Sequence, residues 1–241
     1  MTKPQVKSIH CISGVLLFVC ISWIPQVSRA RYMGEAYFES AMDLYQMNKY
    51  EDAVQRFKKF LELAPHDFYG HYLTARSLGF LGDIDNAIEY YERALAIKDD
   101  YDAHVYAGIL FTTKGKYESA LDHFKKALEI IPDDSDALIH TGDVYRSQKD
   151  FDRAIELYHQ VIEHEPQNSK AYLSMGMALK EKGNLAGAIE NLKKALNIQP
   201  DNAHVHIILG ITLQETGDTN SAHKHFEKAK EIDPDCKVPE N

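Results

Sequence analysis

The chain has 241 residues, of which 44% are hydrophobic and 26% are charged, so its composition is that of a folded protein and excludes a disordered one. Acidic residues number 36 against 27 basic ones, and the resulting net charge of −9 argues against nucleic acid as a partner. Only three cysteines occur, and no two have the spacing of a Cys-x-x-Cys metal or redox motif.

The first thirty residues differ in character from the rest of the chain. They contain three basic residues and no acid, and the uncharged stretch 8–28 has an apolar centre at 12–24. A basic start, a short apolar centre and the small residues Ser28 and Ala30 predict a secretory signal peptide cleaved after Ala30. The alternative is an uncleaved anchor, because the stretch 8–28 could cross a bilayer. In both cases we expect the rest of the chain outside the cytoplasm, periplasmic or secreted, or anchored to a membrane by residues 8–28.

The rest of the chain is an internal repeat with a period of about 34 residues. Each unit has an alanine, a bulky residue four positions later, and a proline twelve positions after the alanine, with Asp99 replacing the proline once. Spacings of three and four residues place the apolar side chains on one face of each of two helices per unit. The alanines are Ala53, Ala87, Ala120, Ala154, Ala188 and Ala222, and the bulky residues are Phe57, Tyr91, Phe124, Tyr158, Leu192 and Phe226.

The turn between the two helices of a unit is marked by a residue suited to the left-handed conformation. Glycine or asparagine occupies this place in five units, and Lys149 in the fourth is expected to carry some strain. An aspartate or asparagine follows directly in four units and is expected to cap the second helix. The turn residues are Asn48, Gly82, Gly115, Gly183 and Gly217, and the capping residues are Asp83, Asp150, Asn184 and Asp218.

The period and the residues that recur at these fixed positions together resemble the tetratricopeptide repeat (TPR) family. The resemblance implies an all-α fold, a right-handed α-solenoid of helix-turn-helix repeats that follows the N-terminal hydrophobic leader. We expect residues 31–33 to be a short linker and 237–241 a tail. The six expected repeats are 34–67, 68–100, 101–134, 135–168, 169–202 and 203–236.

The sixth repeat breaks the apolar pattern that the earlier repeats share on the face turned toward a following repeat. His223 and Lys230 stand where the earlier repeats have Val, Ile or Leu. A terminal repeat must have a polar outer face, so this change predicts the end of the array.

Nothing in the sequence predicts catalysis. It contains no phosphate-binding loop and no His-Glu-x-x-His or Gly-x-Ser-x-Gly motif. The acidic runs 99–102 and 133–136 fall at repeat junctions, where they are expected to cap the next helix. Histidines two apart on a helix point away from each other, so a metal site would need one imidazole from each helix of a repeat. We expect no enzyme, no cofactor and no metal site.

The resemblance also implies a concave groove lined by the first helix of each repeat. Two residues one turn apart in each repeat should face it, and most of them are apolar, whereas a typical family member has tyrosine and asparagine there. The alternative is that some of them only fill contacts between adjacent first helices. The expected groove residues are Phe38, Met42, Tyr72, Arg76, Val105, Ile109, Ile139, Asp143, Leu173, Met177, Ile207 and Ile211.

An apolar groove favours an apolar partner. The lysines and asparagines with which some family members clamp a peptide's C-terminal carboxylate are absent from these positions. The sequence therefore predicts an interaction scaffold that binds an apolar helix or extended segment of a partner protein. A self-assembling scaffold, and a specificity or assembly subunit of a cell-envelope enzyme complex, are the alternatives.

Overall fold

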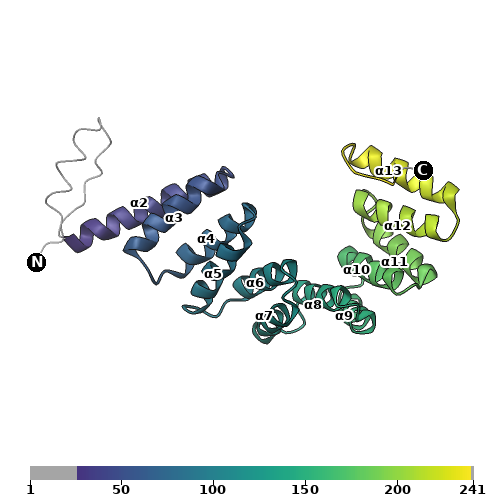
Figure 1. Cartoon of the computed structure of the whole chain (residues 1–241), viewed down its shortest axis with the longest axis horizontal. Helices are drawn as coiled ribbons and strands as arrows, with labels where there is room; N and C mark the ends of the chain where they lie inside the picture. The colour runs from purple at the N-terminus through teal and green to yellow at the C-terminus, as the bar shows by residue number, and fades with distance from the viewer. Residues whose placement is uncertain (1–25, 240–241) are drawn as a thin grey trace, which may run out of the picture. The chain divides into compact units, whose positions relative to one another are not determined.

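The computed structural model describes residues 26–239, with side chains from residue 31 onward, and the expected leader lies largely outside this range. All regular elements among the described residues are α-helices, which confirms the all-α prediction (Figure 1). The first helices of the six repeats are α2 (Gln26–Gln46), α4 (Phe68–Phe80), α6 (Tyr101–Thr113), α8 (Ser135–Ser147), α10 (Ser169–Glu181) and α12 (Ala203–Glu215). The second helices are α3 (Tyr50–Leu63), α5 (Ile84–Leu95), α7 (Tyr117–Ile130), α9 (Phe151–His164), α11 (Leu185–Ile198) and α13 (Thr219–Ile232).

The turns between paired helices have the backbone that the sequence predicts. The four expected glycines have positive φ, as does Asn48, and Lys149 adopts φ 63° although a side chain is disfavoured there. The expected caps are confirmed as well, since Asp83, Asp150, Asn184 and Asp218 each accept a hydrogen bond from a backbone N–H of the helix that follows. The acidic runs act similarly, because Asp100 and Asp134 cap α6 and α8.

Close packing inside a repeat explains why small and bulky residues alternate between the paired helices. Gly142 on α8 faces the ring of Tyr158 on α9 so closely that an added Cβ would lie 2.5 Å from a ring carbon. Gly210 has the same relation to Phe226 in the sixth repeat, also at 2.5 Å. Because Cβ atoms cannot approach that closely, each ring occupies space that only glycine leaves open.

The chain divides into two compact units, Met1–Ile97 and Lys98–Asn241. We call the described parts of these unit 1 and unit 2. The division falls near the end of the second repeat, which is the shortest of the six. Its second helix, α5, has 12 residues, and each of the other second helices has 14. Within unit 2, α11 packs against both α10 and α12, and those two first helices contact each other (Figure 1).

The helix α2 begins earlier than the sequence suggests. Residues 31–33, expected to be a linker, belong to this helix, which starts at Gln26 and runs through the expected cleavage point after Ala30. The apolar centre of the leader, 12–24, lies outside the described residues. Among residues 26–239, none of the helices combines the length and hydropathy needed to cross a bilayer.

Candidate functional site

In unit 2 the first helices of successive repeats share one face. Helix α8 contacts α6 on one side and α10 on the other, and α10 contacts α12. Four of the expected groove residues are half-buried on α10 and α12: Leu173, Met177, Ile207 and Ile211. Leu173 and Ile211 also pack against the buried core around Leu192 and Leu209. We call Leu173, Met177, Ile207 and Ile211 the apolar strip.

Three other expected groove residues belong to the core. Ile139 is fully buried in a cluster with Tyr158, and Val105 and Tyr72 are only 8% and 9% exposed. These side chains fill contacts between helices and offer little surface to a ligand. A lysine at Ile139 would place an ammonium group in the core and destabilise the fold.

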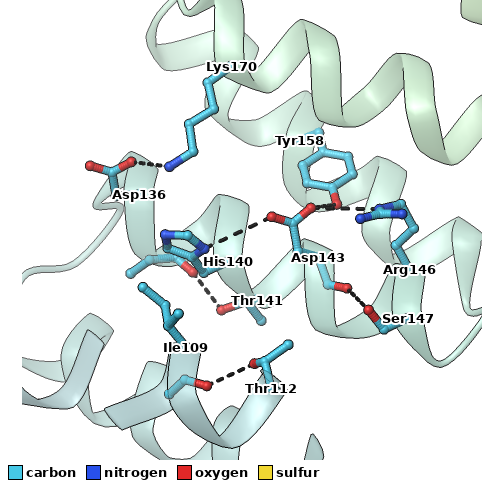
Figure 2. Close-up of polar contacts among 12 residues, drawn as sticks. Ile109, Thr112, Asp136, His140, Thr141, Asp143, Arg146, Ser147, Tyr158 and Lys170 are labelled. Carbon is cyan, nitrogen blue, oxygen red and sulfur yellow. Dashed lines mark hydrogen bonds and ion pairs between the residues drawn. The ribbon is translucent and has the colours of Figure 1, made fainter. Parts of the chain in front are cut away.

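Asp143, at a groove position of α8, has an internal role (Figure 2). Its Oδ1 accepts a hydrogen bond of 2.8 Å from the hydroxyl of Tyr158. Because the ring of Tyr158 fills the space beside Gly142, its hydroxyl reaches the α8 face and needs an acceptor there. Burial raises the pKa of Tyr158, and the negative charge of Asp143 raises it further, so the phenol remains a donor. Asp143 therefore satisfies a buried hydroxyl.

The same carboxylate lies within a charged network. The guanidinium Nε of Arg146 is 3.7 Å from Asp143 Oδ1, and its Nη1 donates to Glu181 of the next repeat at 2.5 Å. Nδ1 of His140 is 4.0 Å from Asp143 Oδ2. Burial lowers the pKa of His140, so this ring is neutral at neutral pH. Charged groups of α8 thus interact with one another and with α10, although Nε of Arg146 is buried without a hydrogen-bond partner.

Hydroxyl groups on this face are engaged by their own helices (Figure 2). Thr112 and Thr141 donate to the carbonyls of Gly108 and Ala137 at 2.8 and 2.7 Å. Ser147 donates to the carbonyl of Asp143 at 2.8 Å. Their donors are already in use, so a ligand on this face would gain little hydrogen bonding from them.

Ion pairs link successive first helices of unit 2. Lys170 on α10 pairs with Asp136 on α8 at 2.7 Å, and Lys180 on α10 pairs with Glu215 on α12 at 2.8 Å. The hydrogen bond from Lys170 lowers the pKa of Asp136. Such partly exposed pairs each contribute about 0 to 1 kcal/mol to the contact between successive repeats.

In unit 1 two of the four corresponding positions are aromatic, Phe38 and Tyr72. Phe38 packs edge-on against Phe57 and Phe60, with ring centroids 5.8 and 5.0 Å apart. The guanidinium of Arg76 lies 5.8 Å from the ring centroid of Tyr72, within the range of a cation–π contact. Met42 and Ile109, the remaining expected groove residues in units 1 and 2, are half-buried.

Comparison with known proteins identifies this architecture. Sequence models described as tetratricopeptide repeat or TPR repeat match the chain at 38–98, 72–135, 111–175, 145–189, 176–217 and 203–236. The chain belongs to the tetratricopeptide repeat family. The TPR fold is that of a protein-interaction scaffold, and members of the family are generally non-catalytic.

Curated TPR proteins share parts of this sequence. The tetratricopeptide repeat-containing protein trd-1 of Caenorhabditis elegans is 28% identical over 132 residues, which are 54% of this chain and 16% of that protein. A TPR repeat-containing protein of Methanocaldococcus jannaschii is 36% identical over 72 residues, 30% of this chain and 23% of that protein. The chain therefore covers less than a quarter of either relative.

Solved TPR structures confirm the fold. PilW, described as a type IV pilus biogenesis factor, has a TM-score of 0.73 at 19% identity and covers 89% of this chain and 97% of its own. MamA has a TM-score of 0.63 at 24% identity, and the match covers 71% of this chain and 94% of MamA. YrrB, described as a TPR protein with an unusual peptide-binding site, has a TM-score of 0.52 at 24% identity. The match covers 74% of this chain and 93% of YrrB.

Two TPR repeats contain a histidine pair that the sequence analysis did not identify. His104 and His123 lie with their Nδ1 atoms 2.9 Å apart, and His206 and His225 have the same distance. In the second pair, Nε2 of His206 donates to the carbonyl of Pro200 at 3.0 Å, so its Nδ1 is the acceptor when the ring is neutral. The two members of each pair have the same separation in sequence, and this shared spacing is the signal that could have revealed them.

The histidine pairs use one imidazole from each helix of a repeat, the geometry that a metal site would need. Their distance is that of a hydrogen bond between two rings. Across residues 26–239, no three or more His, Cys, Asp or Glu side chains are arranged to hold a metal ion. The pairs tie the first helix of the repeat to its second helix.

Proposed function

We propose that this TPR protein is a non-catalytic scaffold that binds an apolar segment of a partner protein on the apolar strip of unit 2. The observation that carries the proposal is the partial exposure of four apolar side chains on the adjacent helices α10 and α12. Polar groups on the neighbouring helix α8 are engaged in internal hydrogen bonds and ion pairs. The strip therefore favours a ligand that gains affinity from apolar burial and needs few hydrogen bonds.

The test introduces a charge into the strip and measures partner binding. Leu173→Lys or Met177→Lys should weaken binding by about thirty- to a thousand-fold, because a lysine would face the desolvated centre of the contact. Asn197→Lys on the exposed side of α11 adds the same charge elsewhere and should leave binding unchanged. Binding is measured by pull-down and mass spectrometry, with far-UV circular dichroism to verify folding.

Two results would contradict this assignment of the strip. Lysine variants that stay folded and still capture the partner would place the interface on another face. Lysine variants that unfold would show that Leu173 and Met177 stabilise the stacking of repeats. A partner that proves to be a second copy of the chain would support the self-assembling alternative.

We propose further that the repeats act outside the cytoplasm, either exported or anchored. The support is the sequence of the leader, with its basic start and its apolar centre at 12–24. Sequencing the N-terminus of protein recovered from its native compartment distinguishes the alternatives. A chain that begins at Arg31 has been processed, and an intact N-terminus in a membrane fraction indicates an anchor. An intact chain in the cytoplasmic fraction would contradict both.

A further inference from the structure

Unit 1 contains an open cavity at the start of the repeats. Its volume is about 780 Å³, and it lies between the N-terminal half of α2, the end of α3 and the start of α4. Two of its large apolar side chains are well exposed, Leu63 at 42% and Tyr69 at 59%. The apolar part of its lining consists of Gly34, Phe38, Phe60, Leu63, Ala64 and Tyr69.

The cavity coincides with a missing side chain. Gly34 stands at the first position of its repeat, where the second and third repeats have Phe68 and Tyr101 and the last three have the small residues Ser135, Ser169 and Ala203. Phe68 is 8% exposed and stacks on Tyr72, with ring centroids 5.6 Å apart. A Cβ at Gly34 would lie 3.8 Å from the ring of Phe60, an ordinary van der Waals distance. The first repeat thus has room for a large apolar side chain that its own sequence does not supply.

Charge distinguishes this cavity from an ordinary apolar surface. Three acids, Glu35, Glu39 and Asp67, line it together with a single base, Arg31. Arg31 is paired with Glu35 at 3.2 Å, so its charge is offset within the lining. The lining as a whole is negative, which favours a ligand with positive charge next to its apolar group.

We propose that this pocket of unit 1 binds a short polypeptide segment in which one large apolar residue, of phenylalanine or leucine size, is flanked by lysine or arginine. The apolar side chain occupies the space beside Gly34, in the way that Phe68 occupies the equivalent place in the next repeat. The flanking cations interact chiefly with Glu39, because Glu35 is paired with Arg31 and Asp67 accepts a hydrogen bond from the backbone N–H of Gly70. The pocket shares no residue with the apolar strip, so it is a second binding site with a different preference.

The experiment uses the full chain and a fluorescein-labelled decapeptide in which one phenylalanine lies between two pairs of lysines. Binding is measured by fluorescence anisotropy. Replacing the phenylalanine of the probe by alanine should weaken binding about 10- to 100-fold, because one large apolar group is no longer buried. Replacing the lysines by glutamates should also weaken it, because the lining is acidic.

Variants of the protein locate the binding. Gly34→Phe fills the cavity from within and should reduce affinity for the phenylalanine probe at least about tenfold. Gly79→Phe is the matched control, because a Cβ at Gly79 meets no atom within 4 Å and this residue is not part of the lining. Glu39→Lys should weaken binding, whereas Glu92→Lys on the exposed side of α5 should not.

The outcomes separate this proposal from the one for unit 2. Leu173→Lys should leave binding of the probe unchanged, so failure of one site does not imply failure of the other. The proposal is overturned if the phenylalanine and alanine probes bind equally, or if a folded Gly34→Phe variant binds like the wild type. If Gly34→Phe fails to fold, the proposal is tested by the ratio of the affinities for the phenylalanine and alanine probes and by the effect of Glu39→Lys on binding.

Discussion

The buried histidine His123 should make unit 2 sensitive to acid. Its side chain is 9% exposed, its ring stacks on Phe111 at 5.2 Å, and its Nδ1 is 2.9 Å from Nδ1 of His104. Burial lowers the pKa of His123 from 6.5 to about 4, and a positive charge on His104 lowers it further. Of the charged neighbours on its own helix, Lys126 lowers this pKa and Asp122 raises it.

The sign of the effect follows from the two pKa values. The unfolded chain takes up a proton at His123 near pH 6.5, and the folded chain takes it up only near pH 4. Stability is therefore at its full value above pH 6.5, falls as the pH drops from 6.5 toward 4, and is constant below that. The whole difference corresponds to about 3 kcal/mol of unfolding free energy, and about 2 kcal/mol is lost by pH 5. Burial also lowers the pKa values of His140 and His225, so both act in the same direction.

Urea unfolding followed by circular dichroism at about pH 7.5 and about pH 5 measures this loss. His123→Asn keeps a donor that can face His104 but does not titrate. Its loss of stability between the two pH values should be smaller than that of the wild type by about 2 kcal/mol. His159→Gln removes an exposed histidine and should retain the wild-type loss. Equal pH dependence in the wild type and His123→Asn would refute the reasoning.

Three further predictions concern the repeat framework, each measured by the same unfolding assay unless stated. Gly142→Ala should cost about 1 to 3 kcal/mol, because its Cβ would lie 2.5 Å from an aromatic ring, whereas Gly79→Ala, which meets no atom within 4 Å, should be neutral or stabilising. Lys149→Gly should gain up to about 1 kcal/mol by relieving the left-handed backbone. Changing His223 to Ile and Lys230 to Leu exposes an apolar face and should cause dimerisation in light scattering; an unchanged monomer would mean that the C-terminal tail covers this face.

The repeat period predicted most of the fold because each residue type that recurs at a fixed position of the repeat has a local physical cause. Turn glycines need positive φ, capping residues need nearby N–H groups, and small residues need a bulky partner in the same repeat. All of these act within a single repeat, and the same causes recur in each of the six repeats. The early start of α2 escaped prediction because residues 26–33 precede the first repeat and have no equivalent to compare. The only sign of the short helix α5 in the sequence was that Ala87 and Ala120 lie closer together than the other recurring alanines.

The candidate site was harder to predict because exposure depends on several helices at once. Ile139 and Leu173 occupy equivalent positions in successive repeats, yet the first is fully buried and the second is half-exposed. Asp143 was expected to face a ligand, but its role depends on Tyr158, whose hydroxyl reaches the same face from the paired helix. The histidine pairs likewise depend on contacts between helices, which a column of one residue type does not reveal.

The two proposed binding surfaces should respond differently to salt. Charged groups near the apolar strip are already paired, as in the contact between Lys180 and Glu215, so a ligand there gains mainly from apolar burial. The pocket of unit 1 has three acids and one base in its lining, so part of its affinity is electrostatic. The distance over which exposed charges interact, the Debye length, falls from about 10 Å at 0.1 M salt to about 3 Å at 1 M salt. Raising the salt concentration should therefore weaken binding of the lysine-flanked probe and leave binding at the strip unchanged or strengthened. Equal salt dependence at the two sites would show that the acids around Gly34 do not select the ligand.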